Sequence, residues 1–261
     1  MEVLGYIASL FIGVTLGLIG GGGSILTVPI LVYLFGINPK LATTYSLFIV
    51  GLTAAIGSVQ HYKMGNIKFK TALYFALPSV IALLLTRKYI LLKVPVAVII
   101  NGSYTVTRSM LIMVLFAILM LLAAYFMLKP QTQTSSSTTI KPLRLSLIGA
   151  GVGVITGFLG AGGGFLIIPT LLFFTKMNMK QAVGTSLLII AFNSFLGFLG
   201  DLINHVEVDY FFMLSLAFIA VVGVYIGTFI SKRVNGNQLK PLFGGFVLVM
   251  GIYIITKEIW F

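Results

Sequence analysis

Residues 17–29 read GLIGGGGSILTVP, and residues 157–169 read GFLGAGGGFLIIP. Each stretch lies inside an apolar segment, about 3–35 and about 143–175, that exceeds the roughly 20 residues of one helical membrane crossing. The glycines disfavour a continuous helix, because glycine loses more backbone entropy on folding than any other residue. The sequence therefore predicts that each segment forms two half-helices joined by a non-helical turn at membrane depth.

The composition of the 261-residue chain excludes a soluble globular protein. Hydrophobic residues make up 59% and charged residues 8%, against about 45–50% and about 25% in typical soluble domains. The chain has no cysteine, 2 histidines and 5 carboxylates, so we expect no metal and no cofactor. Its net charge of +12 comes from bases between apolar runs, which is typical of loops flanking transmembrane helices and not of a nucleic-acid partner. We expect a multi-pass protein of the cell membrane.

The chain contains an internal duplication. The second glycine stretch starts 140 residues after the first (157 − 17), and the same shift aligns the residues that follow. Asn38, Lys40, Ala42, Ser46 and Leu47 meet Asn178, Lys180, Ala182, Ser186 and Leu187. The Ser/Thr/Gln-rich stretch between the copies cannot bury an apolar core. We predict a transmembrane repeat over 1–128, a polar linker over 129–142 and a second transmembrane repeat over 143–261.

Two topologies fit this repeat, and the charges favour one of them. If both glycine-broken segments cross the membrane completely, the bases divide about nine to seven between the faces and specify no orientation. If each segment re-enters as a hairpin, about eleven bases share one face and about five lie opposite, which is a recognisable positive-inside bias. We therefore predict an all-α polytopic membrane protein of two inverted repeats. Each repeat has a glycine-broken re-entrant or discontinuous segment and three transmembrane helices.

The glycine breaks are the candidate binding site. Half-helices that begin near Ser24 and Gly164 would present free N–H groups and the positive end of the helix dipole, which favour an anion. Paired breaks in two halves are typical of transporter sites, although glycines also serve close helix packing. The hydroxyls that follow either cap the next helix or coordinate the same anion. The predicted anion-binding residues are Gly20, Gly22, Gly23, Ser24, Thr44, Ser46, Gly160, Gly162, Gly163, Gly164, Thr185, Ser186 and Asn193.

Titratable residues are scarce near the breaks. His61 and Asp201 correspond under the 140-residue shift and are candidates for a proton relay, although an interfacial position at the end of each helix explains them as well. Arg108 either pairs with the anion or extends from a helix start to the headgroups. The absence of a carboxylate from the middle of any apolar segment argues against a cation pump built on buried acids.

The motif from Gly20 to Pro29, its copy from Gly160 to Pro169, and the segment Ala182 to Ser186 resemble the sulfite exporter TauE/SafE family of membrane anion transporters. The resemblance covers nearly the whole chain. It implies ion-coupled export or uptake of small anions such as sulfite, sulfonates or carboxylates. Thr44-Tyr45 stands where the second copy has Gly184-Thr185, so the two copies need not bind equivalently.

We therefore expect a secondary transporter, not an enzyme, that moves small sulfur-containing or organic anions across the cytoplasmic membrane by alternating access. Its expected partners are the anion, the lipid bilayer and a coupling proton or sodium ion, and a homo-oligomer is left open. An anion channel of the same fold is the main alternative. An intramembrane enzyme would need a nucleophile–base pair or paired acids at depth, and in a scaffold the glycines would govern assembly instead of flux.

Overall fold

The computed structural model describes residues 2–90, 97–101, 104–128, 142–159, 163–175, 177–234 and 236–260. The first half contains α1 (Glu2–Ile19), α2 (Gly22–Tyr33), α3 (Pro39–Lys63), α4 (Phe69–Leu85), the π-helical turn η1 (Thr86–Ile90) and α5 (Arg108–Leu128). The second half contains α6 (Pro142–Leu159), α7 (Gly164–Thr175), α8 (Met179–Ile203), α9 (Tyr210–Arg233) and α10 (Gly236–Trp260). The helical fold is confirmed. An antiparallel hairpin of β1 (Ala97–Asn101) and β2 (Tyr104–Thr107) was not predicted.

Two pairs of helices in corresponding positions of the two halves begin 140 residues apart. α6 follows α1 at this spacing (142 − 2), and α8 follows α3 (179 − 39). The members of each pair also have equal lengths, 18 residues for α1 and α6 and 25 residues for α3 and α8. The half-helices α2 and α7 have 12 residues each, so neither spans a hydrocarbon core of about 30 Å at about 1.5 Å per residue.

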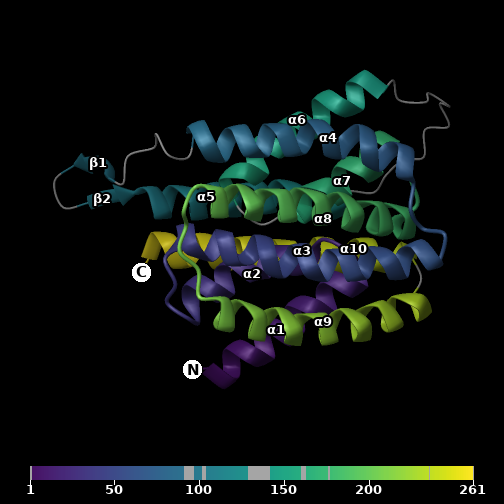
Figure 1. Cartoon of the computed structure of the whole chain (residues 1–261), viewed down its shortest axis with the longest axis horizontal. Coiled ribbons are helices and arrows are strands. Elements are labelled where there is room, and N and C mark those ends of the chain that lie inside the picture. Colours follow the sequence, from purple (N-terminus) through teal and green to yellow (C-terminus); the bar gives the residue numbers. More distant parts are fainter. Residues whose placement is uncertain are drawn as a thin grey trace.

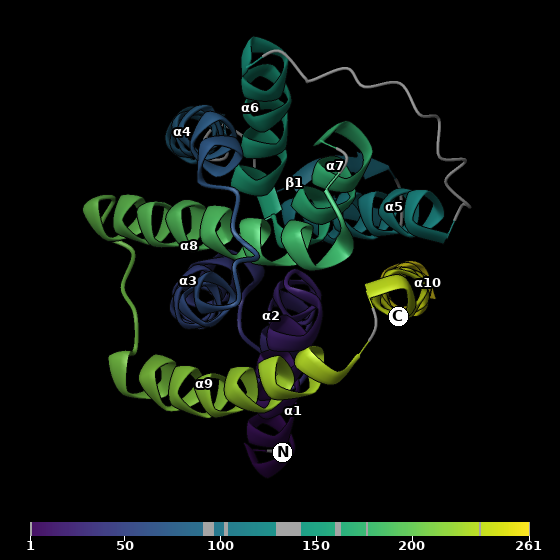
Figure 2. The same cartoon turned by 90° about the vertical axis from the view of Figure 1, so that its right-hand side faces the viewer.

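The helices lie in four layers (Figure 1). α4 and α6 form one outer layer, and α1 and α9 form the other. Between them lie a layer of α5, α7 and α8 and a layer of α2, α3 and α10, which Figure 2 shows from the end of the bundle. The main helix contacts follow this order, because α1 packs on α9, α4 on α6, α5 on α10 and α3 on α8. Each helix therefore lies at the same depth from the centre as its counterpart in the other half.

α3 and α8 pack together at the centre and run in opposite directions. Near the start of α3, the Thr44 hydroxyl donates a 2.7 Å hydrogen bond to the carboxylate of Asp201, near the end of α8. Beyond the end of α3, the backbone N–H of Lys68 donates a 3.1 Å hydrogen bond to the hydroxyl of Thr185, near the start of α8. These two contacts fix the antiparallel alignment of the central pair.

The outer surface of the bundle is suited to lipid. Five helices in the described ranges are long and apolar enough to cross a membrane: Pro39–Lys63, Phe69–Tyr89, Met179–Ile203, Tyr210–Arg233 and Pro241–Glu258. Large apolar side chains such as Phe211, Ile203 and Leu143 are more than 70% exposed. In water this surface would be unfavourable, whereas a bilayer accommodates it. The prediction of a multi-pass membrane protein is confirmed.

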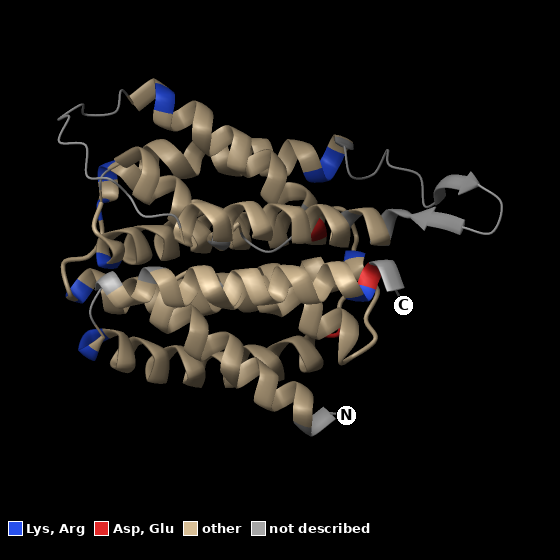
Figure 3. Cartoon of the chain, turned by 180° about the vertical axis from the view of Figure 1, so that it is seen from behind, with Lys and Arg blue, Asp and Glu red and all other residues tan. Residues whose placement is uncertain are grey.

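Lysine and arginine residues lie at the two ends of the bundle (Figure 3), and more of them lie at the end where α3 ends and α8 begins. We call this the basic end and the other the opposite end. The described bases at or next to helix termini of the basic end are Lys63, Lys68, Lys70, Arg144, Lys180, Lys232 and Arg233.

Glycines let the outer helices approach at backbone distance. A Cβ at Gly223 of α9 would lie 2.2 Å from the Leu10 carbonyl oxygen of α1. A Cβ at Gly153 of α6 would lie 2.1 Å from the Ser79 carbonyl oxygen of α4. Both contacts are of the small-residue type that packs membrane helices closely.

We expect Gly223→Leu to lower the stability of the protein by about 1–3 kcal/mol, because an extra side chain in a packed contact forces the backbones apart. Thermal unfolding in detergent measures the change. Gly245→Leu in α10 is the control, since nothing lies within 4 Å of a Cβ at that position. An equal loss in both variants would contradict the packing argument.

Candidate functional site

The first helix break is a tight turn at Gly20, between α1 and α2. Gly20 has a φ of +84°, a left-handed conformation that residues with a side chain rarely adopt. Beyond the turn, α2 lies along α1, and a Cβ at Gly23 would be 2.2 Å from the Ile12 carbonyl oxygen. At the far end, a Cβ at Gly5 would meet the Phe35 ring at 2.0 Å. α1 and α2 therefore form an antiparallel hairpin with the glycines at its tip.

The second break separates α6 from α7. Gly163 has a φ of +72°, and its carbonyl accepts 3.0 Å hydrogen bonds from the backbone N–H groups of Leu166 and Ile167 at the start of α7. The predicted site residues Gly160 and Gly162 lie outside the described residues. Both glycine motifs thus interrupt a helix and start a new one.

The two breaks meet in the middle of the bundle. A Cβ at Gly21 would lie 2.4 Å from the Gly164 carbonyl oxygen. A Cβ at Gly164 would in turn lie 2.9 Å from Ser24 Oγ and 2.6 Å from Ile190 Cδ1. Because Ile190 lies near the midpoint of α8, the starts of α2 and α7 lie side by side about halfway along the central helices.

The start of α2 is left without a side-chain cap. Its N-cap residue is Gly21, and no side chain there accepts a hydrogen bond from the first turn. The Ser24 hydroxyl donates to the Gly21 carbonyl at 2.8 Å, so it does not occupy the N–H groups. Uncapped N–H groups and the helix dipole together form a site for an anion. Gly22 is the first helical residue, whereas Gly23 packs against α1.

The predicted hydroxyls lie inside α3 and α8 and do not cap them. The caps are Asn38 and Asn178, whose side chains accept hydrogen bonds from the backbone N–H groups of Lys40 and Gln181. These two asparagines were matched as counterparts in the sequence, and an asparagine before a helix is a cap signal. The capping interpretation of Thr44, Ser46, Thr185 and Ser186 is therefore wrong.

The four hydroxyls have different surroundings. Thr44 donates to Asp201, Thr185 accepts from Lys68, and Ser186 donates to the Val183 carbonyl at 2.8 Å. Ser46 is completely buried, and its Oγ has no hydrogen-bond partner. A buried polar atom without a partner is costly, so Ser46 is the hydroxyl most available to a ligand.

Asn193 lies in a polar cluster between α8 and α4. Its Nδ2 donates a 2.8 Å hydrogen bond to Ser79 Oγ, while its Oδ1 has no partner. The neighbouring Ser194 Oγ is also buried without a partner, and Ser194 lies against Gly51 of α3. This cluster provides further unpaired polar atoms in the central helices.

The ends of α3 and α8 hold the two candidate relay residues. His61 and Asp201 are 1% and 6% exposed, so both side chains are buried within the protein. His61 Nδ1 lies 3.4 Å from Asn66 Nδ2, and its Nε2 has no hydrogen-bond partner. Asp201 forms an ion pair with Arg87. Arg108 begins α5, and its side chain lies outside what the structure describes.

The sequence reasoning missed Arg87. In the sequence it is only one of the bases that flank the apolar segments, yet it is 5% exposed and lies in the π-helical turn after α4. Its partner Asp201 is 114 residues away. The one available signal is that an arginine and an aspartate each end an apolar segment.

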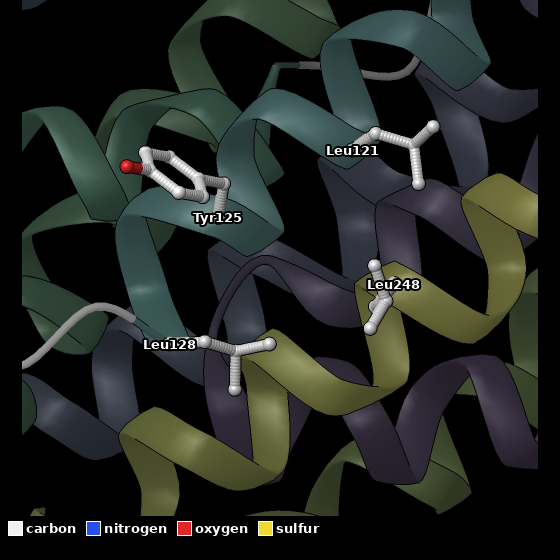
Figure 4. Close-up of a pocket in the computed structure, with 4 residues that line it drawn as sticks. All are labelled: Leu121, Tyr125, Leu128 and Leu248. Atoms are coloured by element: carbon white, nitrogen blue, oxygen red, sulfur yellow. The ribbon is translucent and has the colours of Figure 1, made fainter.

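A hollow of about 410 Å³ lies between α5 and α10 and is lined by Leu121, Tyr125, Leu128 and Leu248. Figure 4 shows these side chains and the two helices that carry them. The lining has no charged group, so this hollow does not suit an anion.

A polytopic helical bundle in which two broken helices meet at the centre is the architecture of a membrane transporter. The profile of the sulfite exporter TauE/SafE family matches residues 5–254. The chain therefore belongs to this family, and it is a transporter and not an enzyme.

Several relatives share almost the whole chain. A probable membrane transporter protein of Xylella fastidiosa (strain 9a5c) is 29% identical over 255 residues, covering 95% of this chain and 92% of the relative. The probable membrane transporter protein YjnA of Bacillus subtilis is 28% identical over 98% of this chain and 100% of its own length. MJ0441 of Methanocaldococcus jannaschii, also a probable membrane transporter protein, is 27% identical over 95% of this chain and 93% of its own length. No solved structure matches the chain.

Proposed function

We propose that this protein is a secondary transporter that moves small sulfur-containing or organic anions, such as sulfite or sulfonates, across the cytoplasmic membrane. The contact between Gly21 and Gly164 is the observation that carries the proposal. It brings the N-termini of α2 and α7 together, and both present backbone N–H groups and positive dipole ends. A small oxyanion accepts several N–H hydrogen bonds at once, which fits a site built from bare backbone.

The transporter consists of two inverted repeats with re-entrant hairpins in this proposal. The opposite directions of α3 and α8 support the inversion, because these helices correspond in the repeat. The return of α2 along α1 supports re-entry. The accumulation of bases at the basic end supports an orientation with that end in the cytoplasm. Alternating access then arises from movement of one repeat against the other around the central site.

The predicted side chains take unequal roles in this site. Ser46 and Asn193 have buried atoms free to bind a ligand. The Thr44 hydroxyl donates to Asp201, so it reaches an anion only after this hydrogen bond breaks. Asp201 and His61, at opposite ends of the bundle, are the candidates for a proton relay; a sodium ion is the alternative coupling ion.

The proposal is tested by counterflow in proteoliposomes. We expect the purified full-length protein to exchange external radiolabelled sulfite for internal sulfite, with saturation and with competition by sulfonates or carboxylates. Chloride at the same concentration is the control for non-specific anion leak. Conductive flux without counterflow would favour a channel, and the absence of flux or binding for every anion of the panel would contradict the proposal.

A further inference from the structure

A buried charge cluster at the opposite end joins four helical elements. The Arg87 guanidinium binds the Asp201 carboxylate with both Nε and Nη2, and the Nε to Oδ1 distance is 2.7 Å. The same carboxylate accepts the 2.7 Å hydrogen bond from Thr44. Arg87 Nη1 donates a 3.4 Å hydrogen bond to the Gly157 carbonyl of α6. Two-point arginine–carboxylate pairing fixes both the distance and the orientation of its partners.

This cluster connects the two halves of the chain. Thr44 and Arg87 belong to the first half, whereas Gly157 and Asp201 belong to the second. Gly157 lies in the last turn of α6, where carbonyls lack helical partners, and a cation there is favourable. Arg87 therefore holds the helix end that leads into the second glycine break.

The charged groups of this cluster are buried although they lie at helix ends. Asp201 is two residues from the end of α8, and Arg87 is in the turn that follows α4. Charged groups at helix ends normally face water or headgroups, but these two are 6% and 5% exposed. The helices thus close over the pair at this end of the bundle.

At the equivalent position of the basic end, the described residues form no such ion pair. Under the 140-residue shift Asp201 corresponds to His61. His61 interacts with Asn66, and its Nε2 has no hydrogen-bond partner. The two ends of the bundle are therefore closed by different chemistry.

We propose that Arg87, Asp201 and Thr44 form a latch that closes the opposite end of the transporter and positions the second glycine break. Opening toward that end requires the ion pair to separate, because the cluster ties α3, η1, α6 and α8 together. The role of the latch in transport rests on the proposed function. The contacts that form the latch are present in the protein without substrate.

The test uses thiol labelling of the full-length protein in proteoliposomes, because the chain has no native cysteine. Leu47→Cys reports on the opposite end, since Leu47 is completely buried one turn deeper in α3 than Thr44. Leu187→Cys, its counterpart in the repeat, is equally buried and reports on the basic end. A membrane-impermeant maleimide is added to one side of the membrane at a time.

We expect Asp201→Asn and Arg87→Gln each to raise the labelling rate at position 47 by about tenfold or more, since breaking a buried pair shifts the population toward the open state. Labelling at position 187 should stay the same or fall. Thr44→Val, which removes only the hydroxyl, should give a smaller rise at position 47. Glu207→Gln, at an exposed carboxylate beyond α8, is the matched control and should change neither rate.

An unchanged rate at position 47 in both Asp201→Asn and Arg87→Gln would overturn the latch. Equal rises at both reporter positions would overturn it too, because they would indicate general loosening and not one-sided opening. The readout needs no substrate, so it separates the two proposals. Intact sulfite binding with unchanged labelling rejects the latch alone, and one-sided opening without any anion binding rejects the proposed function alone.

Discussion

The Gly21→Ala variant should bind and transport its anion at least about tenfold less well than the wild type. The added Cβ would lie 2.4 Å from the Gly164 carbonyl oxygen, so the two breaks must move apart. Displacing one backbone N–H from an anion loses a charge-assisted hydrogen bond worth about 1.5–3 kcal/mol. That loss corresponds to a factor of roughly 10 to 150 in affinity.

The measurement is sulfite binding by calorimetry, together with initial uptake rates in proteoliposomes. Gly151→Ala is the control, because Gly151 is also in a glycine-rich helix yet nothing lies within 4 Å of its Cβ position. Elution as a single species and unchanged helical content separate lost binding from lost folding. Wild-type affinity in a folded Gly21→Ala protein would contradict the assignment of the breaks as the anion site.

Removing one member of the Arg87–Asp201 pair should destabilise the protein strongly. We expect Arg87→Met to cost about 3–5 kcal/mol, because it leaves the Asp201 carboxylate buried without its counter-ion. The double variant Arg87→Met/Asp201→Leu should regain most of this loss, since apolar replacements for a buried pair are often neutral or stabilising.

Thermal unfolding in detergent compares the two single variants and the double variant. The cycle isolates the interaction between the two side chains, provided that each single change creates no new contact. A loss below about 1 kcal/mol for Arg87→Met would mean that the pair behaves as an exposed salt bridge. That result would disagree with the burial of both side chains.

Local chemistry made much of the fold predictable. The helices are interrupted at Gly20 and Gly163, as the glycine runs predicted. Glycine is entropically costly inside a helix, and it readily adopts the left-handed backbone conformation seen at both positions. The repeat predicted the spacing between the starts of α1 and α6 and between the starts of α3 and α8, because the same residues recur 140 positions later. The boundaries of α5 and α6 at Leu128 and Pro142 lie beside the expected linker, although the division into repeats and linker stays a prediction.

Contacts over long sequence distances limited what could be predicted of the site. A single arginine next to a lysine looks the same in sequence whether it faces headgroups or binds an aspartate 114 residues away. The meeting of Gly21 with Gly164 depends on how two hairpins dock, which no local pattern specifies. The hydrogen bond from Thr44 to Asp201 was not predictable for the same reason, because Asp201 is in the other half of the chain.

The central claim is that an anion binds between the two helix breaks, and anomalous scattering from bound selenite tests it most directly. Selenite is the selenium analogue of sulfite, and the chain has no cysteine with which it could react. Crystals of the unlabelled protein with selenite should give an anomalous peak within hydrogen-bonding distance of the backbone N–H groups at the starts of α2 and α7. A selenite peak elsewhere in the bundle, with that position empty at saturating concentration, would contradict the account.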